Sequence, residues 1–133
     1  MITACLEVAT GRRRLTDLTD DLHRFCHGHG DGLLSVFVPH ATCGLALVEV
    51  GAGSEADLLA WIDRLLPRDE RYRHRHGSAG HGADHLLPAL LPPTLTVPVV
   101  GGRPALGTWQ HVVLVDTNPD NPERRVQLDL LPG

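Results

Sequence analysis

Lysine is absent from this 133-residue chain, and all twelve basic residues are arginine. Without lysine, the chain can neither form a lysine Schiff base nor bind phosphate through a P-loop lysine. Recognition of anions is therefore left to guanidinium groups and backbone amides. The formal net charge of −4 also gives no excess of positive charge to neutralise phosphates, so nucleic acid is not expected as a partner.

Cysteine is scarce and shows no pattern. The three cysteines, Cys5, Cys26 and Cys43, are odd in number and contain no Cys-x-x-Cys pair. This excludes a disulfide framework and gives no support for a thiolate zinc site. We interpret the three as small apolar residues, and keep Cys43 only as a weak alternative nucleophile because His40 is near it in sequence.

Long apolar runs are also missing. The longest, residues 86–95, is interrupted by prolines, so no transmembrane helix is predicted. The first five residues lack the basic flank and apolar centre of a signal peptide. We therefore expect a cytoplasmic protein without a membrane partner, folded as a single domain over residues 1–133.

Apolar periodicity predicts an α+β fold. Alternating apolar residues indicate strands over residues 2–8 and 126–130, and β-branched runs indicate strands over 33–38 and 45–50. Residues 95–100 and 107–115 are expected to form a hairpin-like unit around Gly101-Gly102. Helical spacing predicts one helix capped by Thr16 and a second capped by Ser54, with a third beginning at His85 behind Asp84. The prediction is a mainly antiparallel sheet or sandwich with two or three helices.

Histidine is abundant, and several of the nine histidines lie where ligands could reach them. His40 falls at a break between two predicted strands, where it is either open to a ligand or a turn residue bonded to nearby backbone. Residues 68–82 form a polar loop whose length favours a functional role. At the predicted helix start, His85 would have a lowered pKa and stay neutral, as metal binding requires.

Six motifs and one single residue, Glu49, carry a resemblance to a known family. The motifs are His40-Ala41-Thr42-Cys43-Gly44-Leu45, Tyr72-Arg73-His74, Ala83-Asp84-His85-Leu86, Leu95-Thr96-Val97-Pro98, Gly107-Thr108-Trp109-Gln110 and Arg124-Arg125-Val126. In order and spacing they resemble the YjbQ family of small proteins, over roughly residues 33 to 130. The resemblance implies a YjbQ-like α+β fold, a homotrimer, a metal-associated histidine site and an association with a secondary thiamine-phosphate synthase activity.

The resemblance also implies site residues. His40, His74 and His85 are expected to bind one divalent metal ion, with zinc the first choice because neutral imidazole suits it. His76 and His81 are the alternatives to His74 as the second of these three ligands in chain order. Glu49 and Arg125 are the expected catalytic residues. The residues expected to bind substrate are Arg103, Thr108, Trp109, Gln110 and Arg124.

Three departures from the family pattern bear on activity. Val48 and Val50 stand where the family often has asparagine, and Asp116 stands where it usually has glutamate. Losing two amides removes hydrogen-bonding capacity from the expected pocket wall, which predicts a slow reaction.

Three functions are open at this point. The first is a transferase resembling thiamine-phosphate synthase, which joins a pyrimidine-methyl diphosphate to a thiazole phosphate and releases pyrophosphate. The second is a metal-dependent hydrolase of a small phosphorylated or ester substrate, since three histidines and an open position activate water. The third is a non-enzymatic, metal-stabilised trimer that binds a small anionic ligand.

Overall fold

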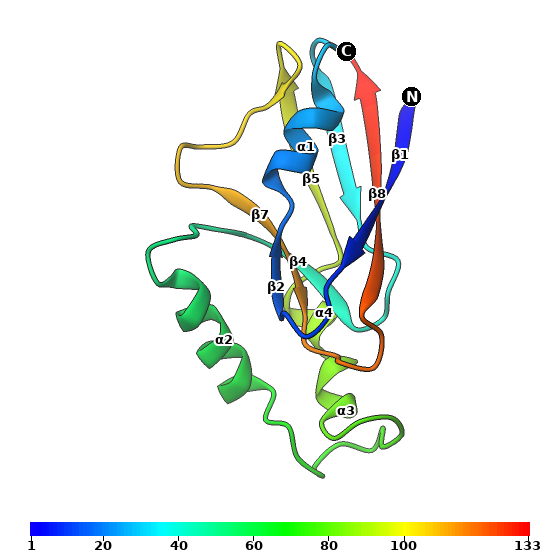
Figure 1. The fold of residues 1–133 in the computed structure, drawn as a ribbon, viewed down its shortest axis with the longest axis vertical. Helices are drawn as coiled ribbons and strands as arrows, with labels where there is room; N and C mark the ends of the chain where they lie inside the picture. The colour runs from blue at the N-terminus through cyan, green and yellow to red at the C-terminus, as the bar shows by residue number, and fades with distance from the viewer.

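The computed structural model describes residues 1–133 and contains two antiparallel sheets (Figure 1). The larger sheet has the strand order β1-β8-β3-β5-β6 and the smaller sheet the order β2-β7-β4. The strands of the larger sheet are β1 (Ile2–Ala9), β8 (Glu123–Pro132), β3 (Gly32–Phe37), β5 (Thr94–Val100) and β6 (Arg103–Pro104). Those of the smaller sheet are β2 (Leu15–Asp17), β7 (His111–Asp116) and β4 (Cys43–Val48). The predicted α+β class with antiparallel sheets is confirmed.

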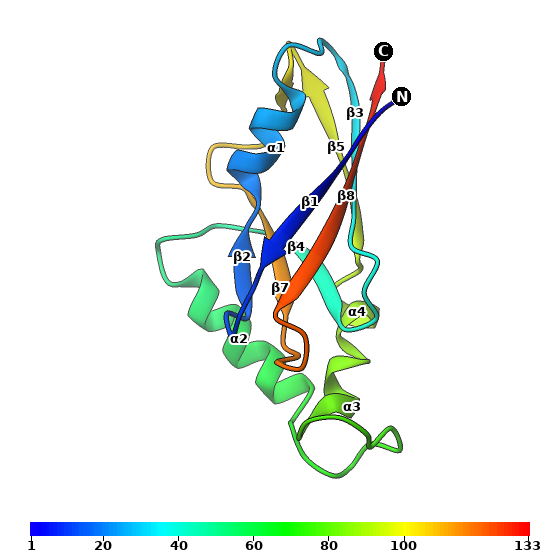
Figure 2. The ribbon, with the colours of Figure 1, turned by 45° about the vertical axis from the view of Figure 1, so that its right-hand side comes forward.

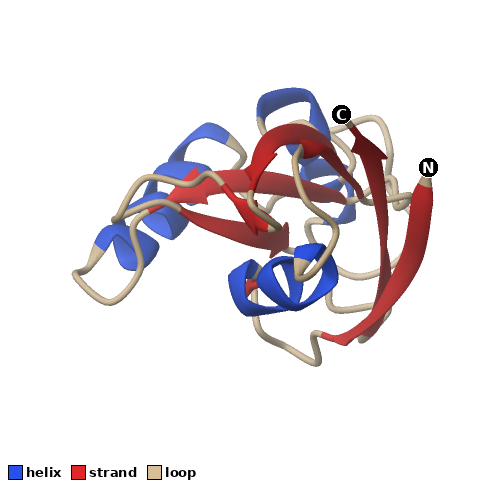
Figure 3. Ribbon diagram, turned by 90° about the horizontal axis from the view of Figure 1, so that it is seen from above, coloured by secondary structure: helices blue, strands red, loops and turns tan.

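The main core is formed by one face of each sheet together with helix α1 (Thr19–Cys26). Inward residues alternate along the strands, as a sheet with one covered face requires. Leu34 and Val36 of β3, Leu114 of β7 and Leu22 of α1 are fully or almost fully buried there. Strands β1 and β8, which carry the two termini, run side by side at one edge of the molecule (Figure 3).

A second, smaller core lies on the other face of the three-stranded sheet. It is covered by α2 (Ser54–Leu65) and by two single-turn helices, α3 (His81–Asp84) and α4 (Leu87–Leu90). Its buried residues include Ile62, Leu87 and Val115. Strand β7 is therefore buried on both faces, and Figure 2 shows α1 and α2 placed one after the other along the long axis. None of the helices combines the length and the apolar character needed to cross a bilayer.

The predicted hairpin is only partly correct. Gly101 and Gly102 have φ values of 58° and 74°, as a tight turn requires, but the turn joins β5 to the two-residue strand β6. After β6 the chain leaves the larger sheet, and β7 pairs with β2 and β4 in the smaller one. The apolar pattern of residues 112–115 marks a buried strand but cannot say which sheet the strand enters.

The predicted helix starts also differ from the structure. Thr16 lies in β2, and the Asp17 carboxylate accepts hydrogen bonds from the amide and hydroxyl of Thr19 at 2.9 and 2.6 Å. Gly53 occupies the N-cap of α2, and Ser54 makes no capping bond. His85 follows α3 instead of beginning a helix, so the predicted helix start at this residue is wrong.

Candidate functional site

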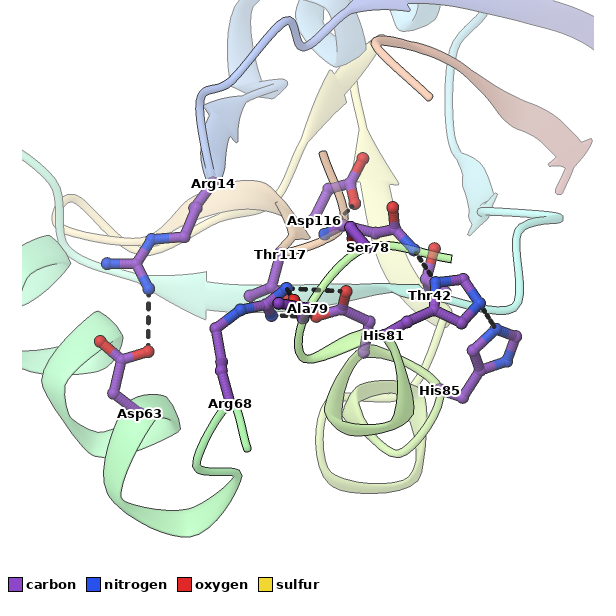
Figure 4. A network of polar contacts seen from close by, with 12 residues as sticks. Arg14, Thr42, Asp63, Arg68, Ser78, Ala79, His81, His85, Asp116 and Thr117 are labelled. Carbon is purple, nitrogen blue, oxygen red and sulfur yellow. Dashed lines mark hydrogen bonds and ion pairs between the residues drawn. The ribbon is translucent and has the colours of Figure 1, made fainter. Parts of the chain in front are cut away.

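Three imidazoles form the candidate site at one end of the molecule. One ring nitrogen from each of His74, His81 and His85 lies within 4.8 Å of the other two. His85 Nε2 and His81 Nε2 are 2.9 Å apart (Figure 4). Three imidazoles that converge on one point form a donor set suited to zinc and similar divalent ions. The residues present therefore fit a metal.

Helix α3 owes its position to a buried carboxylate. The Asp84 side chain is fully buried and accepts two hydrogen bonds from the Arg68 guanidinium. It also accepts the Thr117 hydroxyl hydrogen at 2.6 Å, and Arg68 reaches the carbonyl oxygen of Ala79 at 3.0 Å (Figure 4). These bonds tie α3 to the end of β7 and to its own loop. Asp84 was predicted to cap a helix, and its role is instead to position the two histidines beside it.

The far side of the His81 ring is held by the loop that follows β7. His81 Nδ1 lies 3.0 Å from Asn118 Nδ2 and 3.2 Å from a carboxylate oxygen of Asp120. The Asp120 carboxylate also accepts the Ser78 amide hydrogen, which is the first cause of its lowered pKa. A carboxylate beside the outer nitrogen of a histidine orients the ring and leaves the inner nitrogen for a metal.

The electrostatics of the cluster favour the neutral form of two of its imidazoles. Burial lowers the pKa of both His74 and His85, and the neighbouring histidines lower each pKa further. The lowered pKa of His85 was predicted, but its cause is burial among other imidazoles and not a helix N-terminus. Neutral imidazole is the metal-binding form, so the lowered pKa values of His74 and His85 favour metal binding by these two residues.

His40 is not one of the three clustered histidines. It lies in the connection between β3 and β4, where its Nε2 accepts the backbone amide hydrogen of Arg125 at 2.9 Å. Its pKa is lowered by burial, and also by Arg124 and Arg125. His40 borders a pocket of about 580 Å³. The lining residues of this pocket are Glu7, Val8, Ala9, His40, Asn121, Glu123, Arg124 and Arg125.

The two adjacent arginines of β8 have different environments. Arg124 is buried, and its guanidinium forms two hydrogen bonds with Asp116, at 2.6 and 3.3 Å, and one with Thr42 at 3.2 Å. Arg125 is exposed and borders the pocket. Since side chains alternate along a strand, only one of the pair can face solvent. Asp116, noted above as a departure from the family pattern, is thus the partner of a buried arginine.

Glu49 and the Gly107 to Gln110 segment lie at the opposite end of the small sheet. Val48 pairs with His111, whereas Cys43 pairs with Asp116 at the end nearer the histidine cluster. A six-residue strand is roughly 16 Å long, which keeps the two ends apart within one chain. Gln110 fixes the segment as a turn, because its Oε1 accepts the Gly107 amide hydrogen at 2.8 Å. Thr108 is exposed, and Trp109 is 70% exposed.

Two further candidate residues stand apart from the cluster. Arg103 borders a separate pocket beside His23 and His27 of the α1 region. Cys43 is buried, and burial is the first cause that raises the pKa of its thiol to about 12. A thiol that stays protonated is a poor nucleophile, so the alternative nucleophile drawn from the sequence is not supported.

The structure adds His81 to the site, and the sequence contained a signal for it. His81 and His85 are four residues apart, a spacing that places two side chains on one face of a helical turn. The family motifs cover His74 and His85, whereas His81 is expected only as an alternative to His74; the structure brings both His74 and His81 into the cluster.

Comparisons with known proteins bear on the family and on the fold. A family model described as UPF0047 protein YjbQ-like matches residues 4–133. The chain is 62% identical over 133 residues to a UPF0047 protein of Mycobacterium tuberculosis, covering 100% of both. It is 35% identical over 121 residues to a UPF0047 protein of Archaeoglobus fulgidus, covering 90% of this chain and 93% of the other.

Solved structures of other proteins have a similar fold. The crystal structure of a hypothetical protein from Aeropyrum pernix K1 matches with a TM-score of 0.88 and 32% identity, covering 100% of both chains. That of a protein of unknown function from Sulfolobus solfataricus P2 matches with a TM-score of 0.91 and 25% identity, covering 99% of this chain and 97% of the other.

Proposed function

The chain belongs to the YjbQ-like UPF0047 family, and from this premise we propose that it is a metal-dependent transferase resembling thiamine-phosphate synthase. It would join a pyrimidine-methyl diphosphate to a thiazole phosphate and release pyrophosphate. The observation that carries the proposal is the convergence of His74, His81 and His85 on one point. These three residues would hold a divalent ion such as zinc, which would supply positive charge to offset the negative charge that develops on the diphosphate oxygens.

The reaction needs little from the protein beyond positioning and charge. The thiazole nitrogen forms a bond to the pyrimidine methylene carbon while the bond from this carbon to the diphosphate oxygen breaks. The electron pair of the broken bond leaves with pyrophosphate, so no protein nucleophile is required. This agrees with the properties of the Cys43 thiol, whose pKa is raised to about 12 by burial first of all, so that it would be a poor nucleophile.

Arg125 is the proposed phosphate-binding residue. It borders the 580 Å³ pocket together with His40, whereas the neighbouring Arg124 is already bonded to Asp116. The loop after β7 connects this pocket with the cluster, because Asn121 borders the pocket and Asn118 contacts His81. An exposed guanidinium can bind a phosphate through two parallel hydrogen bonds.

We also propose that the protein is a homotrimer in which neighbouring subunits complete the site. Glu49 and Trp109 lie at the end of the small sheet away from the histidine cluster, and strand β4 separates the two ends. A head-to-tail ring would bring this end of one subunit to the cluster of the next. Trp109, 70% exposed in one chain, would gain apolar contacts in such a ring.

The test is an assay of pyrophosphate release on zinc-loaded protein with both phosphorylated substrates. Release is expected from the wild type and should be lost in His81→Ala, Glu49→Gln and Arg125→Ala. His27→Ala is the matched control, since it removes an exposed imidazole that follows α1. Val48→Asn combined with Val50→Asn should raise the rate if these residues face the substrate, since each buried polar group left without a partner costs about 1 to 3 kcal/mol.

Two results would contradict the proposed reaction and favour the alternatives. Phosphate release from one substrate and water would identify a hydrolase. Tight binding of a small anion with no turnover would identify a ligand-binding trimer. In either case, metal content measured in the same samples tells whether the histidine site itself is correct.

A further inference from the structure

A fourth imidazole packs against the three proposed metal ligands. The ring centroid of His76 lies 4.1 Å from that of His74 and 4.6 Å from that of His81. It lies farther from His85, at 6.2 Å. His76 is not one of the three residues with mutually close nitrogens, so its side chain must rotate to reach an ion held by them.

The loop around His76 directs its side chain toward the cluster. The Arg75 guanidinium donates hydrogen bonds to the carbonyl oxygens of Tyr72 and Glu70, at 2.8 and 3.0 Å. The arginine between the two histidines is therefore turned back onto its own loop. His74 and His76, which flank it, pack against each other.

The backbone beside His76 is fixed against the cluster. Gly77 has a φ of 81°, and a Cβ atom there would lie 2.7 Å from His81 Nδ1 and 2.9 Å from a carboxylate oxygen of Asp120. The amide of Ser78 donates a hydrogen bond to the same carboxylate at 3.2 Å. The backbone is thus held close to the cluster, while the side chain of His76 is exposed, as a side chain that changes rotamer requires.

We propose that His76 is a displaceable fourth ligand of the metal, an inference that rests on the proposed metal site. Zinc with four protein ligands is closed, whereas zinc with three keeps a position for water or substrate. With His76 rotated inward, the ion has four imidazoles. When a phosphate oxygen takes its place, His76 returns to its packing against His74. The step exchanges one ligand for another and involves no change in oxidation state.

The test uses Co²⁺ in place of zinc, because its visible absorption spectrum responds to the number and type of its ligands. The protein is loaded with Co²⁺ and titrated with inorganic phosphate. His76→Ala should still bind one ion per chain, with a changed spectrum before phosphate is added. If His76 occupies the fourth position about nine-tenths of the time, the phosphate midpoint should be about tenfold lower in His76→Ala.

Two further variants separate this inference from the proposed site. His81→Ala should lose the ion, and His27→Ala should behave as the wild type. If His76→Ala matches the wild type in spectrum and midpoint, His76 is not a ligand. If His76→Ala loses the ion, His76 is a permanent ligand and not a displaceable one. If His76→Ala loses the ion while the wild type binds it, the proposed metal site is kept and only the displaceable role of His76 is wrong. A wild type that binds no Co²⁺ contradicts both proposals.

Discussion

The buried carboxylate of Asp84 accepts hydrogen bonds from both Arg68 and Thr117. We expect these bonds to hold the histidine cluster together. We predict that Asp84→Asn lowers the free energy of unfolding by about 2 to 3 kcal/mol, as expected when a hydrogen bond to a charged partner is lost. Zinc affinity should fall with it, since α3 carries His81 and precedes His85. Urea unfolding and zinc competition with a chromophoric chelator measure the two effects.

Arg71→Ala is the matched control for this prediction. Arg71 pairs with Asp69 in the same loop, but both side chains are largely exposed. An exposed ion pair of this kind contributes little, so stability should change far less than in Asp84→Asn. Equal effects of Asp84→Asn and Arg71→Ala would show that the buried carboxylate has no special role.

At the level of single residues, the sequence identified positions more reliably than it identified roles. His74 and His85 were found by their motifs, and both lie in the cluster. Arg124 and Arg125 are the same residue type, so only the alternation of β8 reveals that one is buried against Asp116. His40 was grouped with the ligands because short motifs carry no information about distances between loops.

At the level of elements, the packing of α3 on residues 72–74 sets the geometry of the site. A Cβ atom on Gly82 would lie 2.5 Å from Tyr72 Cβ and 2.6 Å from the His74 carbonyl oxygen. We predict that Gly82→Ala pushes α3 away from His74, costs about 1 to 3 kcal/mol of stability and weakens zinc binding. Thermal unfolding and the zinc competition assay should both report the change.

Gly11→Ala separates this effect from a general loss of stability. Gly11 has a φ of 59° and open space around it, so alanine there costs about 1 to 2 kcal/mol through the backbone alone. Zinc affinity should stay at the wild-type value. A Gly82→Ala protein that binds zinc as well as Gly11→Ala would rule out the packing argument.

The elements themselves were predictable where one local pattern determines them. β1 and β8 alternate cleanly, and they pair along eight residues. The single-turn helices α3 and α4 are too short to give a periodic pattern, so the sequence suggested one helix beginning at His85. The strands that pair with β7 could not be predicted from local sequence patterns either, because the loop between β6 and β7 carries the chain from one sheet to the other.

At the level of the whole molecule, the lowered histidine pKa values predict how stability depends on pH. Burial lowers the pKa of His40, His74 and His85 below the usual value. Between these lowered values and the unfolded value of about 6.5, the unfolded chain binds more protons than the folded one. The free energy of unfolding of the metal-free protein therefore rises with pH through this window and falls on acidification.

Urea unfolding at about pH 7, 6 and 5 tests this dependence. The fall in stability between the highest and lowest pH should be smaller in His40→Gln than in the wild type, because glutamine does not titrate. A larger fall in His40→Gln would contradict the direction of the shift for His40.

The proposed ring of subunits predicts that two inactive variants restore each other. Glu49→Gln keeps the histidine cluster, and His81→Ala keeps the carboxylate at the other end of the small sheet. If one site uses the cluster of one subunit and Glu49 of the next, equal mixing with subunit exchange should make about one site in four complete. Pyrophosphate release in the mixture should then approach one quarter of the wild-type rate, while either variant alone stays inactive. If both groups act within one chain, no mixed trimer has a complete site, and the mixture will be as inactive as its parts.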